Sequence, residues 1–408
     1  MAPSNGNTVL GSAGYLANPY PTFQRLRRED PVHWSDEWGC WLVTRYDDVA
    51  SVLRDTVGFS SAGRFAAMLG RLPLALRGRI LDAWPLAGLF QSDPPEYTRH
   101  RRLVGKVFTH RLRLLPQRIE QMVSTIVAAA TLRGEIDIIR DLAVPLPADV
   151  VLDLLGIPAT DRTHFKATSD TIISLLSSGT PDVDRVEQFC AATADAMERI
   201  GHLLEDRRAR PLDDMLSELA SPGPSDPLMT DAELLVTMIQ FLLAGHETTT
   251  NLIGNGMLSL LRNSDQSREL HDHIDDAALV ASAVEELLRF ESPLQRLARL
   301  VTRDVEVRGK RISKGDTVML MLGAANRDPL AFPAPDTLDI RRQPNRHAAF
   351  GFGAHFCLGA PLARMEGASV FSALLRLPRL RLIDEFPEWQ ENVTFHGVKT
   401  LRVAIDAF

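Results

Sequence analysis

Short segments in which hydrophobic and polar residues alternate occur near the start of the chain and again after residue 300. Pro31–Ser35 and Trp41–Tyr46 are predicted to be two strands joined by a tight turn. Val301–Val307 and Thr317–Leu322 are predicted to form a second strand region, with turns at the glycines between them. These four segments are too short and too few for an all-β protein.

Most of the remaining chain has the spacing of apolar residues that is typical of helices. This pattern extends from about Asp93 to Arg262, and we expect breaks at Pro145, Pro147 and Pro158. A last helix is predicted at Ala360–Leu375. Since no break has the composition of a linker, we expect one mainly α domain with small β-sheets over the whole chain, residues 1–408.

One helix is predicted to be unusually long and buried. It follows a proline-rich loop at Ser221–Pro227, and Thr230 and Glu233 have the spacing of a capping box at its start. No strong stop signal occurs before Arg262-Asn263, so the helix has roughly 32 residues and a length of about 48 Å. Its middle is apolar on nearly every face, which indicates a helix in the core.

Composition and charge exclude several classes of protein. Of 408 residues, 45% are hydrophobic and 24% charged, and the net charge of −7 argues against general binding to nucleic acid or anionic lipid. There is no run of 18 apolar residues and no signal-peptide pattern, so we expect a cytoplasmic protein with no membrane partner. The three cysteines, Cys40, Cys190 and Cys357, do not form a disulfide pattern.

The segment from Phe350 to Gly359 carries the most specific chemistry. Cys357 stands just before a predicted helix, and a thiolate, the metal-binding form of cysteine, is favoured near the N–H groups of a helix N-terminus. Gly353 and Gly359 let the backbone approach a flat ligand closely. Taken alone, a single cysteine is more often inert packing. A dinucleotide loop would need glycine at Phe356, and a zinc site would need further ligands nearby.

Four ordered motifs resemble those of the cytochrome P450 superfamily, in its soluble bacterial type. The similarity extends from Asn18-Pro19-Tyr20 to Leu362-Ala363-Arg364. The motifs are Ala244-Gly245-His246-Glu247-Thr248, Glu286-x-x-Arg289, Asn326-Arg327-Asp328-Pro329 and Phe350-x-x-Gly353-x-His355-x-Cys357-x-Gly359.

The resemblance implies the cytochrome P450 fold, with haem b buried between the long helix and the cysteine loop. Cys357 would be the axial thiolate ligand of the iron. The other residues that the resemblance places at the haem are Tyr97, Arg101, Ala244, Gly245, Arg299, Phe350, Gly353, His355 and Gly359. Arg101, Arg299 and His355 would bind the propionates, and Tyr97 stands where many bacterial relatives have a histidine.

Glu247 and Thr248 match the acid–alcohol pair that delivers protons in the family, and Gly245 would permit a local opening of the helix. The alternative is a surface glutamate and a threonine bonded to its own helix. Glu286 and Arg289 share a helix face, and the resemblance implies a buried cluster completed by Arg342.

Two further regions have weaker signals. A basic run from Arg99 to Arg113 is either a solvated helix face or, as in the family, the docking site of a ferredoxin-type electron donor. The stretch Gly63–Phe90 would cover an apolar substrate pocket. Its aromatic and Met residues are Phe65, Met68, Trp84 and Phe90, and its arginines, which could bind a carboxylate, are Arg64, Arg71, Arg77 and Arg79.

The sequence therefore predicts a monomeric monooxygenase that inserts one atom of O₂ into a small apolar organic substrate by hydroxylation or epoxidation. Only about 50 residues follow Cys357, too few for a reductase domain, so the electrons would come from a separate ferredoxin. A peroxygenase driven by H₂O₂ and a non-enzymatic haem sensor or ligand carrier are the alternatives.

Overall fold

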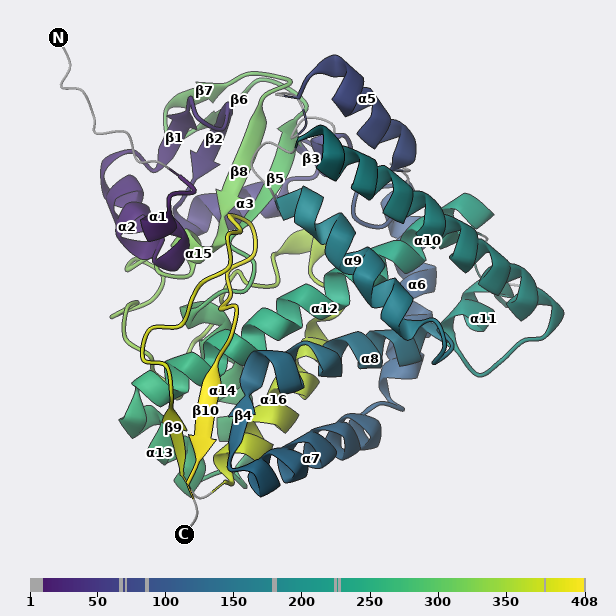
Figure 1. Cartoon of the computed structure of the whole chain (residues 1–408). Coiled ribbons are helices and arrows are strands. Elements are labelled where there is room, and N and C mark those ends of the chain that lie inside the picture. Colours follow the sequence, from purple (N-terminus) through teal and green to yellow (C-terminus); the bar gives the residue numbers. More distant parts are fainter. Residues whose placement is uncertain are drawn as a thin grey trace.

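The computed structural model describes residues 10–65, 69, 72–84, 88–177, 182–223, 226, 229–377 and 379–406. Met68, Arg71 and part of the loop Ser221–Pro227 lie outside these ranges. Helices form most of the molecule, and one sheet stands at one end of it (Figure 1). This confirms a mainly α fold with small sheets.

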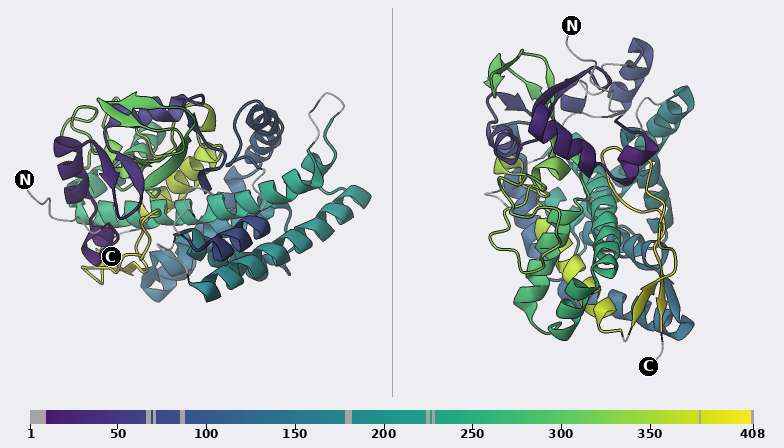
Figure 2. Two further views of the ribbon diagram at one scale, coloured as in Figure 1. Left: turned by 90° about the horizontal axis from the view of Figure 1, so that it is seen from above. Right: turned by 90° about the vertical axis from the view of Figure 1, so that its left-hand side faces the viewer.

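The longest helix, α12 (Asp231–Arg262), runs through the middle of the molecule in all three ribbon views (Figures 1 and 2). Thr230 and Glu233 form the predicted capping box, and the 32-residue length also agrees with the prediction. Most of its side chains from Leu234 to Leu260 are buried, because other helices cover it on several sides.

The helices that pack directly on α12 come from distant parts of the chain. They are α8 (Pro145–Leu155), α9 (Arg162–Ser177), α10 (Val183–Ala209), α11 (Met215–Ala220), α13 (Ser264–Asp272), α14 (Ala277–Phe290), α16 (Ala360–Leu375) and the π-helical turn η2 (Ile138–Ala143). The remaining helices are α1 (Ala13–Ala17), α2 (Tyr20–Glu29), α3 (Tyr46–Arg54), α5 (Leu74–Ala83), α6 (Glu96–Leu112), α7 (Pro116–Arg133), α15 (Leu322–Ala325) and the 3₁₀ turn η3 (Gly353–His355).

The main sheet has the strand order β1-β2-β8-β5-β3. Its strands are β1 (Val32–Ser35), β2 (Cys40–Val43), β3 (Phe59–Ser60), β5 (Arg296–Val301) and β8 (Thr317–Met321). Only the β2–β8 pair is parallel. A three-stranded sheet holds β4 (Glu135–Asp137), β10 (Arg402–Ile405) and β9 (Leu380–Leu382), and β6 (Val305–Val307) pairs with β7 (Lys310–Ile312).

Three details of the predicted elements are wrong. The second strand ends at Val43, because Tyr46 begins α3, whose first turn carries two acidic residues that favour a helix start. The predicted break at Pro145 is confirmed, since η2 ends at Ala143 and α8 begins at Pro145, but Pro147 does not break a helix: it lies in the first turn of α8, where the missing N–H has no helical partner in any case. Val301 ends a strand that begins at Arg296, and Val305–Val307 belongs to a separate hairpin.

Candidate active site

The loop that carries Cys357 is held in a defined shape by its own backbone. The Cys357 N–H donates to the Phe350 carbonyl at 3.0 Å, and the Phe356 N–H donates to the Gly353 carbonyl at 3.1 Å. Gly353 has a φ of +73°, and a Cβ there would lie 2.9 Å from the backbone oxygen of Leu53. Only glycine therefore lets this loop pack closely on α3.

The sulfur of Cys357 lies at the start of α16, where the backbone N–H groups of Gly359 and Ala360 reach it. Burial raises the pKa of the thiol, while these N–H groups and the guanidinium groups of Arg101 and Arg364 oppose that rise. A coordinated metal ion would remove the proton outright. The donor set thus suits a metal-bound thiolate.

Cys357 faces a cavity of about 1160 Å³ that separates the loop from α12. The cavity brings together most of the haem-contacting residues that the sequence predicts. Those that line it are Tyr97, Arg101, Ala244, Gly245, Arg299, Phe350, His355, Cys357 and Gly359, and the predicted catalytic residue Thr248 lines it as well. Gly353 and Glu247 do not line it; Gly353 shapes the loop from behind.

Positive charge accumulates on one side of this cavity. Arg299, on β5, is 2% exposed and donates to the carbonyl of Ala298 at 2.9 Å, with no carboxylate partner among the described residues. Burial, together with the neighbouring Arg64, lowers its pKa to about 9. Burial likewise lowers the pKa of Arg64 to about 10. Asp93, the carboxylate beside them, has both its oxygens bonded to Ser60 and Ser61.

His355 completes this charged side. Its buried Nε2 has no hydrogen-bond partner among the described residues. Burial, with the nearby Arg299, lowers its pKa to about 4, so the imidazole is neutral at pH 7. A buried donor without a partner is costly, and cations without carboxylates are costlier. The two propionates of a haem would accept the missing hydrogen bond of His355 and neutralise the buried arginines, so these residues fit that cofactor.

Tyr97 and Arg101, both on α6, hold the cysteine loop in place. The Tyr97 hydroxyl donates to the carbonyl of Ala354 at 2.6 Å, and its ring lies 3.9 Å from that of His355. Arg101 donates to the carbonyl of Phe356 at 2.9 Å. Propionate binding by either residue remains a prediction, since each already has a partner in the loop.

On α12, Thr248 and Glu247 lie in different surroundings. The Thr248 hydroxyl lines the cavity and donates to the carbonyl of Ala244 at 2.9 Å. The Glu247 carboxylate instead accepts from Asn251 at 3.2 Å, and burial raises its pKa. The structure thus places the alcohol in the cavity and the acid beside it, against Asn251, rather than side by side.

The predicted opening of α12 at Gly245 is absent, because the helix is continuous from Asp231 to Arg262. Gly245 has a different use: a Cβ there would lie 2.5 Å from Cγ2 of Val151. The glycine therefore allows α8 to pack closely against α12 beside the cavity.

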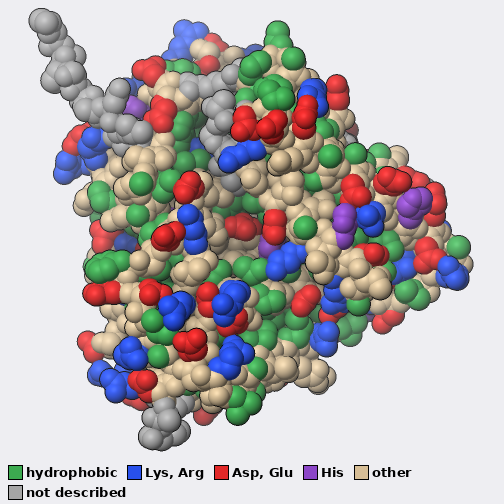
Figure 3. Space-filling view, in the orientation of Figure 1, with side chains coloured by type: hydrophobic (Ala, Val, Ile, Leu, Met, Phe, Trp, Pro, Cys, Tyr) green, Lys and Arg blue, Asp and Glu red, His purple; other side chains and the backbone are tan. Residues whose placement is uncertain are grey.

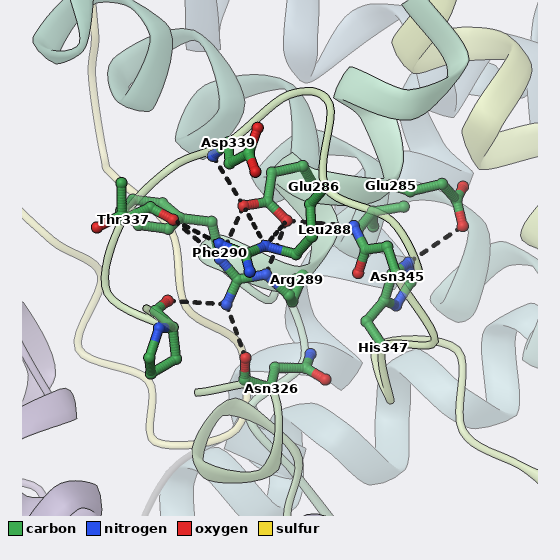
Figure 4. Close-up of polar contacts among 12 residues, drawn as sticks. Glu285, Glu286, Leu288, Arg289, Phe290, Asn326, Thr337, Asp339, Asn345 and His347 are labelled. Atoms are coloured by element: carbon green, nitrogen blue, oxygen red, sulfur yellow. Dashed lines mark hydrogen bonds and ion pairs between the residues drawn. The ribbon is translucent and has the colours of Figure 1, made fainter. Parts of the chain in front are cut away.

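The predicted buried cluster of Glu286, Arg289 and Arg342 is confirmed, and Figure 4 shows Glu286 and Arg289 within it. Arg289 binds the Glu286 carboxylate through two bonds of 2.7 and 2.8 Å, and Arg342 approaches the same oxygens at 3.1 and 3.2 Å. Backbone carbonyls of the proline-rich stretch accept the remaining guanidinium protons, among them those of Pro333 and Pro335. The cluster joins α14 to that stretch and does not line the cavity.

Two buried polar residues near the site escaped prediction from the sequence. Gln240 on α12 is 2% exposed and lines the cavity, and Glu366 on α16 is fully buried. Gln240 could have been noticed as the one amide within the apolar run Leu234–Leu243, eight residues before Thr248. Glu366 follows the cysteine loop in a helix of mixed polarity and gives no comparable signal.

Comparison with known proteins agrees with the architecture. The sequence profile of the family described as Cytochrome P450 matches residues 165–398. The cytochrome P450 monooxygenase PikC of Streptomyces venezuelae is 38% identical over 97% of this chain and 93% of its own length. Vitamin D(3) 25-hydroxylase of Pseudonocardia autotrophica is 38% identical over 97% of this chain and 96% of its own.

Among solved structures, P450BioI in complex with an acyl carrier protein ligated to hexadec-9Z-enoic acid has a TM-score of 0.89, at 31% identity, over 97% of this chain and 99% of its own. The chain therefore belongs to the cytochrome P450 family and has its fold. It is a P450 monooxygenase, whose cofactor is haem b with an axial cysteine thiolate.

Proposed function

We propose that this enzyme inserts one atom of O₂ into an uncharged, largely apolar small molecule, by hydroxylation or epoxidation, with Cys357 as the axial ligand. The observation that carries the proposal is the position of the Cys357 sulfur. The sulfur faces a cavity of about 1160 Å³ and accepts hydrogen bonds from N–H groups at the start of α16. Ala244 and Thr248 of α12 line the same cavity. The bound haem supplies the activation of O₂, and its thiolate ligand favours cleavage of the O–O bond.

The charges around the cavity support an uncharged substrate. The described residues that line the cavity include four arginines, Arg64, Arg101, Arg296 and Arg299, and two glutamates, Glu37 and Glu391, which leaves an excess of two positive charges. The two haem propionates balance that excess. A substrate carboxylate would then have no cation left among these residues. Arg79, which was considered for such a role, is instead paired with Glu187 at the surface.

The relatives support a bulky apolar substrate, since one of them is named for the 25-hydroxylation of vitamin D(3). Aromatic and aliphatic side chains dominate the wall away from Cys357, including Phe65, Trp84 and Phe90 of the predicted covering stretch. Such a wall binds through burial of apolar surface.

Electrons would come from a separate ferredoxin-type donor that docks beside the cysteine loop. Helix α6 lies against that loop, because Arg101 bonds to Phe356 and a Cβ on Gly105 would lie 3.8 Å from Leu358. Arg102 and Arg113 are exposed on and just after this helix. We further propose a monomer in the cytoplasm; Cys40, Cys190 and Cys357 form no disulfide bond, which is compatible with a reducing compartment. No described helix is long and apolar enough to cross a bilayer.

The test is the absorbance of the reduced protein with CO. Cysteine thiolate ligation gives a strongly red-shifted band, which Cys357→Ser should abolish. Cys40→Ser and Cys190→Ser are the matched controls and should leave the band unchanged. A band that persists in Cys357→Ser would overturn the assignment of the ligand.

A further inference from the structure

Gln240 is a polar residue in the part of the cavity wall that lies away from Cys357. Residues 240, 244 and 248 are spaced by four and so share one face of α12, and Gln240, Ala244 and Thr248 all line the cavity. With a rise of 1.5 Å per residue, Gln240 lies about 12 Å along the helix from Thr248. The cavity thus has a polar group well separated from its reactive end.

The hydrogen bond from Phe90 fixes how the Gln240 amide is oriented. The backbone N–H of Phe90 donates to Oε1 of Gln240 at 3.3 Å. Because a backbone N–H can only donate, the oxygen must face Phe90, and the Nε2 group is the free one. That Nε2 group is buried and has no acceptor among the described residues.

A second hydrogen-bond donor in the same cavity wall is also buried and unpaired among the described residues. The indole Nε1 of Trp84 is buried without an acceptor in the part of the chain that the structure describes, and Trp84 is 4% exposed and lines the cavity. Its ring is held by Phe189, with the ring centroids 5.8 Å apart. Gln91, which also lines the cavity, has a buried Oε1 with no partner among those residues. Buried polar groups nearly always have partners in folded proteins, so three such groups in one cavity wall point to a ligand.

We propose that Gln240 and Trp84 form a polar end of the substrate cavity that recognises an acceptor oxygen on an otherwise apolar, uncharged substrate. The proposal rests on the proposed function, since it takes the cavity above Cys357 as the substrate site. Two N–H donors select a carbonyl or hydroxyl oxygen, and a hydroxyl can in addition donate to Gln91. The oxygen would lie about 12 Å from the position oxidised near Thr248.

The experiment compares two probes that differ in a single carbonyl. The dissociation constants of 5α-androstan-3-one and 5α-androstane are measured with the haem-loaded protein by calorimetry. Both are rigid, and their length is comparable to the spacing between Gln240 and Thr248. The parent protein should bind the ketone about fivefold to tenfold more tightly than the hydrocarbon, the effect expected of one buried hydrogen bond.

Gln240→Leu should remove most of this preference while leaving the affinity for the hydrocarbon unchanged, which also shows that the cavity is intact. Trp84→Phe keeps the ring and removes the N–H, and should reduce the preference in part. Thr237→Val is the matched control: Thr237 is buried on the same helix with an unpartnered hydroxyl but does not line the cavity. This variant should keep the full preference.

Equal affinity of the parent for the two steroids, or no binding of either up to its solubility limit, would overturn the proposal. So would a preference that persists in both Gln240→Leu and Trp84→Phe. The proposed function fails by a different measurement, a thiolate band with CO that is missing from the parent or persists in Cys357→Ser. A protein without that band could still prefer the ketone in calorimetry, so the two failures are distinguishable.

Discussion

Glu366 is a carboxylic acid enclosed by protein where α16 packs on α12. It is 0% exposed, and the Thr249 hydroxyl is close, yet neither carboxyl oxygen has a hydrogen bond of ordinary geometry among the described residues. Burial raises its pKa from 4.5 to about 8, because the charged form loses its hydration without gaining a partner. The side chain is therefore largely protonated at neutral pH.

This burial makes stability depend on pH in a defined direction. Above a pH of about 4, the unfolded chain releases the proton that the folded protein keeps until about pH 8. The free energy of unfolding should thus fall as the pH rises through this window. Glu366→Gln removes the titration, so its Tm should fall less than that of the parent between pH 5 and pH 8. Glu198→Gln, at an exposed position on α10, is the control and should follow the parent.

Thr248 is the residue that separates O₂-driven from peroxide-driven chemistry. Its hydroxyl lines the cavity and is anchored to the carbonyl of Ala244, so it can pass a proton to a group in the cavity. Thr248→Ala should keep haem and substrate binding and continue to consume electrons. The product formed per electron should fall several-fold, because O₂ reduced without timely protonation leaves as H₂O₂. Product formation driven by added H₂O₂ should change much less.

The product formed per electron and the product formed from added H₂O₂ are measured on one substrate, with electron consumption, H₂O₂ and product followed together. Full coupling in Thr248→Ala would contradict the proton-delivery role. A parent enzyme that works only with added peroxide would favour the peroxygenase alternative instead.

Residues with a fixed sequence spacing were predictable, and those placed by packing were not. The resemblance named ten haem-contacting positions in advance, and nine of them meet in one cavity. The position of Glu247 outside the cavity was not predictable, since it depends on how the other helices pack around α12. The packing of Gly245 against Val151 depends on α8, nearly 100 residues earlier.

At the scale of elements, the junction between α14 and the proline-rich stretch depends on one buried carboxylate shared by two arginines. Arg342→Met removes one of the two guanidinium groups that donate to the buried Glu286 carboxylate. Loss of one member of a buried ion cluster lowers the free energy of unfolding by about 3–5 kcal/mol. Denaturant unfolding of the haem-loaded protein should show this loss. The neighbouring Arg341→Met is the control, because Arg341 is half exposed and pairs with Glu269 at the surface. Its effect should stay below about 1 kcal/mol, and equal effects of the two variants would contradict the buried role.

Element prediction succeeded where local signals were strong. The capping box and the long apolar run gave the bounds of α12, and Ala360–Leu375 was predicted at its observed bounds. It failed at strand ends, where pairing decides the outcome: Arg296–Val301 is a strand because it pairs with β8 on one side and β3 on the other. No local pattern contains that information.

At the scale of the whole molecule, charged side chains of both signs are interspersed over the face shown in Figure 3. The basic run on α6 is also less basic than its sequence suggests. Arg99 is paired with Glu233, Lys106 with Asp226, and Arg111 with Asp213 and Glu218. The sequence could not show this, because the acids come from α12, α11 and the loops that flank α11.

Arg102 and Arg113 are exposed members of the run that form no salt bridge with the described residues, and they carry the last prediction. If an acidic ferredoxin docks there, electrostatic attraction should make its association sensitive to salt, because screening reduces the reach of exposed charges to about 8 Å at 0.15 M. Donor-dependent reduction should therefore slow as salt rises from 0.02 to about 0.3 M.

Arg102→Glu and Arg113→Glu should each raise the Kd for the donor several-fold while leaving substrate affinity unchanged. Arg381→Glu reverses an exposed charge on β9, in the three-stranded sheet, and should have little effect. Since Arg99, Lys106 and Arg111 are paired with four carboxylates, the positive charge of Arg102 and Arg113 should account for most of the salt dependence. Stopped-flow reduction at several salt concentrations measures this, and a donor Kd that ignores both salt and these two reversals would place the docking site elsewhere on the molecule.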